Sequence, residues 1–208
     1  MNILNALALI FILFSVSCAA PLHNSFLKKE GVSKLNHFFS EGKEKALYTA
    51  EISIYGKSFS GLMFLKKIGE GNFRTVFMTP TGATLLDFSI INRSATLNFA
   101  IEEMNKSYIV NTLSKDMELL VITGTFNDYA EIFLNPETDE TVFKIRDGEN
   151  FIWYFADKES NVKRIEYTDE FDYKIIALFE KKSDSELCDI AITHQNINLS
   201  IRLKELPN

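Results

Sequence analysis

The feature that most constrains the fold of this chain is a two-residue alternation of apolar and polar side chains, repeated in many short runs. It is clearest near the end of the chain, where Ile197, Leu199, Ile201 and Leu203 alternate with polar residues. Such alternation is typical of β-strands that bury one face. The same period recurs over residues 48–54, 73–77, 97–101, 151–155 and 173–179.

Turn-forming residues separate these runs at short, regular intervals, which is typical of strands joined by hairpins. Because strands twist, a long antiparallel meander of this kind closes into a barrel or forms a strongly curved sheet. The sequence therefore predicts a mainly β protein. The turn signals are Gly69–Gly71, Pro80–Gly82, Asn135–Pro136, Asp147–Gly148 and Lys158–Asn161.

Residues 102–122 break the alternation, because their apolar residues are spaced closer to the helical period of 3.6. We expect one or two short helices here, with Ser114 as a candidate cap for a second piece. Such a helix inserted in the meander would cover its open mouth or concave face. No linker or repeat indicates a second domain, so residues 43–208 are expected to form a single β-barrel domain.

Composition limits the classes of function. Hydrophobic residues make up 46% of the 208 residues, and 18 of them are Phe, which predicts an interior filled or partly lined by aromatic rings. The net charge of -6 argues against a nucleic-acid binder, which would carry a basic stripe. It also argues against docking on anionic lipid by charge alone.

The first residues have the pattern of a secretory signal. An apolar run leads to Ser15-Val16-Ser17-Cys18, which is the layout of a bacterial lipoprotein signal over residues 1–17 with Cys18 as the acylated residue, for instance by palmitate. Residues 18–42 are then the lipidated cysteine and a tether with a short helical stretch. The alternatives are simple secretion with cleavage after Ala19 or Ala20, or an uncleaved helix, for which the run is short.

The search for a catalytic or metal site finds no established spacing. The three histidines, His23, His37 and His194, are scattered, and no zinc or cofactor motif occurs, so no metal, no cofactor and no enzymatic activity are expected. Cys188 lies between apolar residues, which favours a buried inert thiol over a nucleophile. Asp169 and Asp172 form an acidic turn that leaves a secreted hydrolase as an alternative.

A further apparent motif, Gly69–Val76, resembles the glycine-rich loop of protein kinases. Arg74 stands where that loop has its third glycine, and no catalytic His-Arg-Asp follows. We therefore interpret it as a hairpin turn.

The middle of the chain resembles a known family. The segments that carry the resemblance are Phe59–Phe64, Asn72–Gly82 and Thr84–Phe88, in which an alternating apolar strand runs into a Pro-x-Gly turn and returns as an aliphatic strand. They are similar to the LolB-type outer-membrane lipoproteins of the LolA/LolB family of lipoprotein carriers. The resemblance covers about residues 44–125.

That resemblance implies a half-open antiparallel β-barrel with a short helical lid over an apolar cavity that accepts acyl chains. The implied partners are an acylated lipoprotein or lipid, a periplasmic carrier protein and the outer membrane, reached from the periplasmic side through Cys18. The expected function is lipoprotein or lipid transfer. Cavity candidates are Phe64, Phe77, Leu86, Phe88, Phe99, Met104, Leu113, Met117 and Phe133.

One residue departs from the family pattern. In LolB an exposed leucine in the Pro-x-Gly loop helps to deliver cargo into the membrane, and Thr81 stands at that position between Pro80 and Gly82. Threonine buries less apolar surface and carries a hydroxyl that must stay solvated or bonded. This departure supports an alternative function, a structural or partner-binding envelope lipoprotein on the same fold with no lipid cargo.

Overall fold

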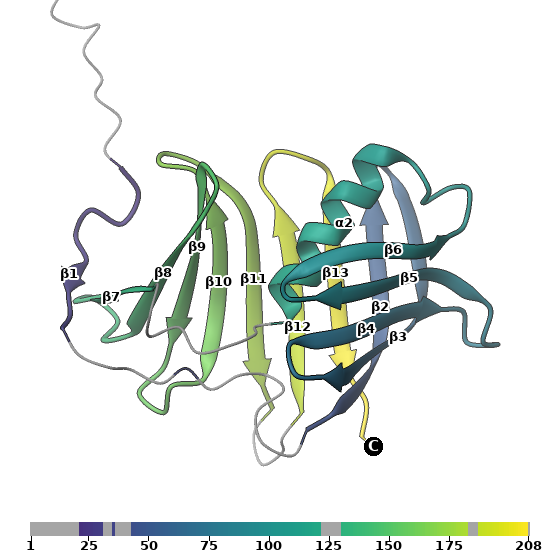
Figure 1. The fold of residues 1–208 in the computed structure, drawn as a ribbon, viewed down its shortest axis with the longest axis horizontal. Coiled ribbons are helices and arrows are strands. Elements are labelled where there is room, and N and C mark those ends of the chain that lie inside the picture. Colours follow the sequence, from purple (N-terminus) through teal and green to yellow (C-terminus); the bar gives the residue numbers. More distant parts are fainter. Residues whose placement is uncertain (1–20, 31–34, 36–42, 122–129, 183–186, 208) are drawn as a thin grey trace, which may run out of the picture.

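The computed structural model describes residues 21–30, 35, 43–121, 130–182 and 187–207. In this part of the chain, 13 strands form one antiparallel sheet and a single α-helix packs on it (Figure 1). The bounds are β1 Leu27–Lys28, β2 Lys45–Ile54, β3 Lys57–Gly69, β4 Asn72–Met78, β5 Thr84–Ile91, β6 Ser94–Ala100, α2 Ser107–Leu120, β7 Glu131–Leu134, β8 Thr141–Asp147, β9 Asn150–Ala156, β10 Val162–Thr168, β11 Tyr173–Lys181, β12 Cys188–His194 and β13 Leu199–Glu205.

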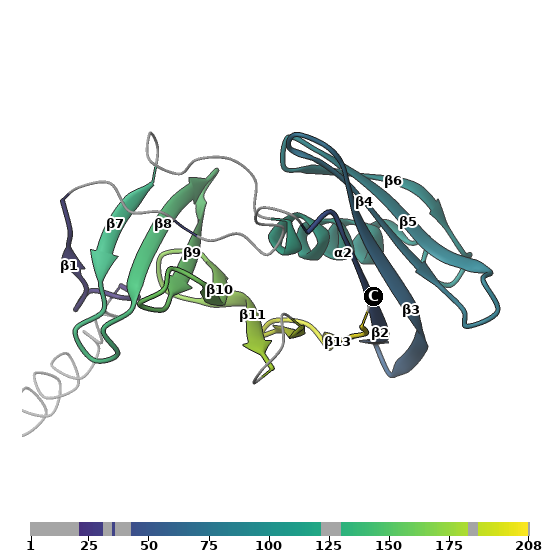
Figure 2. The same cartoon turned by 90° about the horizontal axis from the view of Figure 1, so that it is seen from below.

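The sheet is open and strongly curved. Its strand order is β1-β7-β8-β9-β10-β11-β12-β13-β2-β3-β4-β5-β6, so β1 and β6 are its two edges. Figure 2 shows that both ends of the sheet bend to the same side and that α2 lies within the curve. The predicted curved antiparallel meander is confirmed in this coarse form: it is a mainly β fold with one short helix, and the sheet does not close.

Apolar alternation in the strands builds the main core on the concave side. Along β2, Ala46, Tyr48, Ala50 and Ile52 are buried, and β13 pairs with β2 in a register that sets Leu203 opposite Ala50. Paired residues of neighbouring strands point to the same face of a sheet, so the two alternations reinforce each other. The core therefore continues from one strand to the next around the curve.

The helix α2 is continuous through residue 114. The chain enters it at Lys106, whose side chain makes no capping hydrogen bond, and Ser114 lies in the helix interior. The prediction of Ser114 as a cap is therefore wrong. The reason is that one apolar stripe, Ile109, Leu113, Met117 and Leu120, faces the core along the whole length, and its burial outweighs the local preference of serine for a helix start.

The glycine pair that resembled a kinase loop forms a hairpin, as expected. Strand β3 ends at Gly69 and β4 begins at Asn72, which is paired with Gly69. Gly71 has a φ of +67°, a conformation that costs glycine little because it has no Cβ. The turn thus reverses the chain between two strands, and Gly71 O accepts a hydrogen bond from Asn92 N.

Strand β9 is apolar on both faces. In β9, Ile152, Tyr154 and Ala156 belong to the main core, whereas Trp153 and Phe155 belong to a second buried cluster. Because alternate strand residues point to opposite faces, this second cluster lies on the other face of the sheet. We call it the outer cluster; its members are Val142, Trp153 and Phe155, with Phe26, Phe133 and Phe151 packed against them.

The N-terminal segment 21–30 covers the outer cluster. Leu22 N donates to Glu170 O at 3.1 Å, β1 pairs with β7, and Lys29 N donates to Ile132 O at 2.8 Å. The ring of Phe26 lies 6.0 Å from that of Phe155. This part of the expected tether is therefore docked on the sheet, and Leu35, also in the tether, packs against the main core.

Removal of a core side chain under α2 should destabilise the fold strongly. Leu113 is fully buried, and Leu113→Ala should lower the free energy of unfolding by about 2–5 kcal/mol, because it leaves a cavity against the concave face. Urea unfolding measures the change. The matched control is Leu178→Ala on β11, where the side chain is 49% exposed, and here the loss should stay below about 1 kcal/mol. Equal losses in the two variants would contradict the packing of α2.

Candidate functional site

The concave face beneath α2 is the main candidate site, and the structure brings six of the nine predicted cavity residues together there. These six side chains are at most 2% exposed and share one apolar cluster with strands from most of the sheet. They come from β4, β5, the turn before α2 and α2 itself. The six are Phe77, Leu86, Phe88, Met104, Leu113 and Met117.

The other three predicted residues lie elsewhere. Phe64 is half-buried and pairs with Val76, next to the pair of Met63 with Phe77, so it faces away from Phe77. Phe99 is 47% exposed on the edge strand β6. Phe133 packs in the outer cluster, 6.0 Å from the ring of Trp153. Apolar side chains occur on both faces of these strands, and sequence spacing alone does not say which face meets α2.

Three polar residues within one turn of α2 contact three distant parts of the sheet. Glu118 Oε1 accepts a hydrogen bond from Ala95 N of β6 at 2.9 Å. Asp116 Oδ1 lies 2.9 Å from His194 Nε2 at the end of β12. Lys115 Nζ lies 3.1 Å from Asp147 Oδ2 at the end of β8. Because β6 and β8 lie near opposite ends of the sheet order, α2 joins the two ends of the open sheet across its concave side.

The contact of Asp116 with His194 is buried in the main core. Their side chains are 0% and 3% exposed, and Asp116 Oδ2 has no hydrogen-bond partner in the described part of the chain. Burial raises the pKa of Asp116, although the hydrogen bond from His194 lowers it in part. Sequence reasoning missed this pair, but a signal was present: Asp116 lies on the apolar stripe between Leu113 and Leu120.

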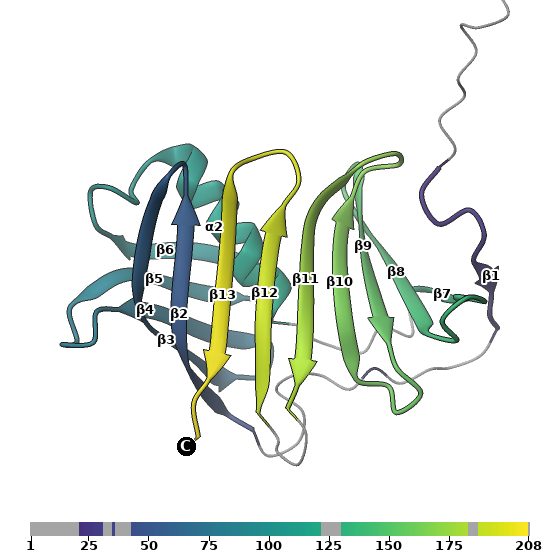
Figure 3. The ribbon, with the colours of Figure 1, turned by 180° about the vertical axis from the view of Figure 1, so that it is seen from behind.

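The Pro80–Gly82 loop projects from one end of the molecule, between β4 and β5 (Figure 3). Its residues are exposed, and Gly82 N donates to Thr79 O at 2.9 Å. The Thr81 hydroxyl lies 2.9 Å from that of Thr79, which also accepts from Ala83 N. The polar atom that distinguishes Thr81 from leucine is thus bonded within the turn itself.

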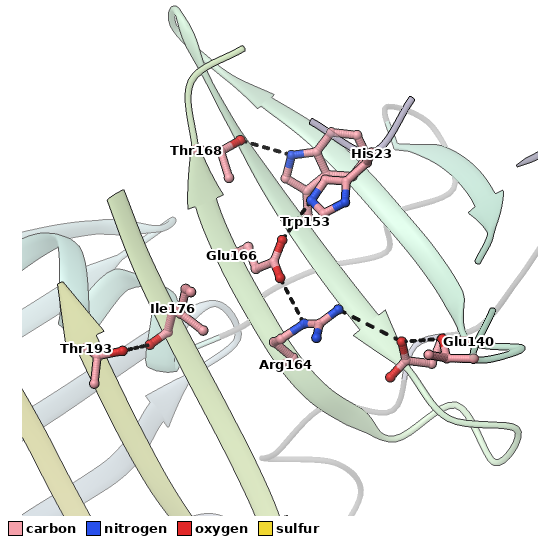
Figure 4. Close-up of polar contacts among 9 residues, drawn as sticks. His23, Glu140, Trp153, Arg164, Glu166, Thr168, Ile176 and Thr193 are labelled. Atoms are coloured by element: carbon pink, nitrogen blue, oxygen red, sulfur yellow. Dashed lines mark hydrogen bonds and ion pairs between the residues drawn. The ribbon is translucent and has the colours of Figure 1, made fainter. Parts of the chain in front are cut away.

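On the outer face, His23 from the N-terminal segment meets a buried carboxylate (Figure 4). His23 Nε2 lies 2.7 Å from Glu166 Oε2, and Arg164 Nε lies 2.9 Å from Glu166 Oε1. Beside them, Trp153 Nε1 donates to Thr168 Oγ1 at 3.1 Å. The Glu166 carboxylate and the Trp153 indole N–H thus have partners among the aromatic rings, and the contact from His23 ties the N-terminal segment to the sheet. Nothing in the spacing of His23 predicted them.

Cys188 and Asp169 were considered for catalysis, but their surroundings fit a structural role. Burial, then the nearby Glu205, raises the pKa of the Cys188 thiol to about 11, which opposes the thiolate needed for nucleophilic attack. Asp169 Oδ1 accepts hydrogen bonds from Phe171 N and Asp172 N, and these backbone contacts lower the pKa of Asp169. Asp169 therefore closes a turn between β10 and β11.

Among the described residues, no group of three or more His, Cys, Asp or Glu side chains is placed to hold a metal ion. No helix in the same ranges combines the length and the apolar character needed to cross a membrane. Cys18 and His37 lie outside the described residues.

Comparison with known proteins identifies no family. No family model matches the chain, and no curated protein matches it in sequence. Among solved structures it is similar to a DUF1329 family protein from Desulfovibrio piger, with a TM-score of 0.43 and 9% sequence identity, over 80% of this chain and 85% of that chain. Similarity at this level is too low to assign a family or a function.

The buried Asp116 should make stability fall as pH rises. Its pKa is raised above the ordinary value of 3.8, so the folded state holds the proton more tightly than the unfolded state. The resulting stabilisation is full below that value and is lost as pH rises through the folded-state pKa. Asp116→Asn should therefore gain stability relative to the wild type as pH rises above about 4 in urea unfolding experiments.

The control is Asp87, a carboxylate whose pKa is shifted in the opposite direction. The hydrogen bond from Arg74 lowers the pKa of Asp87, so Asp87 stabilises the fold above its ordinary pKa and loses this effect as pH falls. Asp87→Asn should therefore lose stability relative to the wild type at neutral pH, by an amount that shrinks as pH falls. Parallel pH profiles for the two variants would contradict the assignment.

Proposed function

We propose that this protein is a membrane-anchored lipoprotein that binds acyl chains between α2 and the concave face of its sheet, and so acts in lipid or lipoprotein transfer. The observation that carries the proposal is the position of α2. One amphipathic helix covers the apolar side of an open sheet. The helix is not itself part of the strand pairing that builds the sheet. Such a helix can separate from the sheet without breaking any strand pairing.

The free energies of burial support the replacement of the helix contacts by an acyl chain. Four apolar side chains of α2 contribute about 1.5–3 kcal/mol each when buried, or about 6–12 kcal/mol together. An acyl chain of about 14 methylene groups contributes about 11 kcal/mol when it is buried, at about 0.8 kcal/mol each. A chain that replaced the stripe of Ile109, Leu113, Met117 and Leu120 could therefore offset the loss of those contacts.

The sequence resemblance to the LolA/LolB family supports the same function, and the Pro80–Gly82 loop refines it. If Cys18 is acylated, its Cα lies within about 11 Å of the Cα of Pro21, because three residues span no more than that. In Figure 1 the N-terminal segment and the β4–β5 loop lie at opposite ends of the long axis. An anchored protein would therefore not bring both ends close to one bilayer unless it lay flat, which agrees with the polar Thr81 in the loop.

A second candidate function is a partner-binding scaffold with no lipid cargo. The observation that favours it is the dense packing under α2, where Phe88, Met104 and Leu113 are completely buried by protein atoms alone. In this case α2 stays in place and ligands bind elsewhere. The acyl-binding experiment distinguishes the two functions.

Acyl binding is tested by native mass spectrometry of the protein purified from cells that express the full chain, before and after addition of palmitate or an acylated peptide. We expect a mass increase equal to the added ligand. Met117→Ala should increase the bound fraction, because an engineered apolar cavity accepts apolar guests, whereas Leu178→Ala on the exposed side of β11 should not. An unchanged protein mass in all three proteins would overturn acyl binding and favour the scaffold.

The membrane anchor is tested separately by metabolic labelling with radioactive palmitate. The wild type should incorporate label and sediment with membranes, and Cys18→Ser should lose both properties, because the thiol is the acceptor. Cys188→Ser is the matched control and should keep the label, since Cys188 is the free cysteine within the fold. Equal labelling of the wild type and Cys18→Ser would rule out the anchor and leave simple secretion.

A further inference from the structure

One end of the sheet is formed by a row of neighbouring turns. Pairing is antiparallel from β10 through β11, β12 and β13 to β2, so β10, β12 and β2 all end at the same edge of the sheet. The turns that follow these three strands therefore lie next to one another, and they form the upper end of the molecule in Figures 1 and 3. We call this row the turn edge; it consists of the turns at residues 169–172, 195–198 and 55–56.

Backbone hydrogen bonds join the members of the turn edge. Gln195 N donates to Lys174 O at 3.0 Å, which joins the β12–β13 turn to the start of β11. Tyr55 N donates to Asn198 O at 2.9 Å, which joins the β2–β3 turn to the β12–β13 turn. The turn edge is therefore one connected surface, and its turns keep their positions relative to one another.

Exposed aromatic side chains lie along the turn edge. Phe171 in the β10–β11 turn is 47% exposed, and Tyr55 in the β2–β3 turn is exposed to a similar extent. Tyr108, in the first turn of α2, is also exposed, and the centroid of its ring lies 5.3 Å from that of Tyr55. Aromatic side chains of this kind are enriched where a protein meets the interface between water and lipid.

The N-terminal segment brings the proposed anchor to the same edge. Leu22 N donates to Glu170 O at 3.1 Å, so this segment begins beside the turn that carries Phe171. Cys18 precedes Pro21 by three residues, and three residues span no more than about 11 Å. A lipid on Cys18 would therefore hold the turn edge close to the surface of the bilayer.

The charges near these aromatic side chains indicate the kind of lipid surface. Glu170 and Asp172 are exposed on either side of Phe171 in the chain. Lys57, after the β2–β3 turn, and Lys106, before α2, are exposed as well. Acidic and basic side chains thus both occur, whereas recruitment by anionic lipid needs a basic cluster. Contact with a bilayer of zwitterionic lipid would therefore depend on the aromatic side chains.

We infer that the turn edge is the surface with which this protein lies on a zwitterionic bilayer, with Phe171, Tyr55 and Tyr108 inserted between the lipid head groups. This inference rests on the proposed membrane anchor and specifies the orientation of the anchored protein. A single acyl chain binds a membrane only marginally, so the aromatic contacts add a second source of affinity. The start of α2 then faces the lipid from which an acyl chain would enter. The β4–β5 loop lies lower than the turn edge in Figures 1 and 3, so it stays off the bilayer.

The test places a fluorescent side chain on the turn edge. Trp153 is the single tryptophan of the chain and is buried in the outer cluster, so it gives a constant background. Phe171→Trp adds a tryptophan to the turn edge, and Leu178→Trp adds one at a control position that is equally exposed but lies within β11. Each protein is purified after expression of the full chain and reconstituted into phosphatidylcholine vesicles. The lipid carries bromine near the head-group end of its acyl chains, where it quenches tryptophan on contact.

Brominated lipid should quench most of the fluorescence that Phe171→Trp adds and little of the fluorescence that Leu178→Trp adds. Addition of anionic phosphatidylglycerol should not increase the quenching, because acidic side chains adjoin Phe171. In a second measurement, Phe171→Ala should transfer from one vesicle to another about tenfold faster than the wild type, since it loses the apolar burial of the ring. Leu178→Ala is the control and should transfer at the wild-type rate.

The outcomes separate the orientation of the protein from the anchor on which it rests. Vesicle-bound Phe171→Trp that is quenched no more than Leu178→Trp, or wild-type transfer of Phe171→Ala, would overturn the turn edge as the contact surface while the anchor stands. The exposed aromatic side chains would then be left for a protein partner. Quenching that needs phosphatidylglycerol would show attraction by charge and would also overturn the inference. Protein that stays with no vesicle would overturn both the anchor and the orientation.

Discussion

Burial of the apolar stripe of α2 is the interaction on which the rest of this structure depends. An open sheet of 13 strands has a large apolar concave face, and no second sheet packs on it in the described part of the chain. A single helix of 14 residues supplies the cover. Because its polar contacts reach β6, β12 and the end of β8, the same helix also sets how far the two ends of the sheet stand apart.

The second constraint is that β9 is apolar on both faces. A strand of this kind must be covered twice, and the N-terminal segment provides the outer cover with Phe26 and His23. The buried Glu166 carboxylate then needs partners. His23 contacts one of its oxygens and Arg164 contacts the other. The segment that begins at residue 21 is thereby part of the folded body, so the proposed anchor at Cys18 would hold this end of the sheet near the membrane.

The two segments that cover the sheet are held in different ways. The N-terminal segment is the outer cover, and α2 is the inner cover. The outer cover is fastened by strand pairing of β1 with β7 and by the His23 contact. The inner cover is held by packing and by side-chain contacts of Lys115, Asp116 and Glu118. Apolar packing is not directional, so an acyl chain can replace it, whereas strand pairing has no such substitute.

The sequence by itself determined the strand periods, the hairpin turns and the position of the single helix, because alternation and turn chemistry are local properties of neighbouring residues. Of the nine residues that it offered as cavity candidates, six meet under α2. Only the tertiary structure decided that Phe64, Phe99 and Phe133 face elsewhere, since strands with two apolar faces carry no local mark of which face is concave. The pairing of Asp116 with His194 was likewise decided by the curvature of the sheet, which brings together residues 78 positions apart.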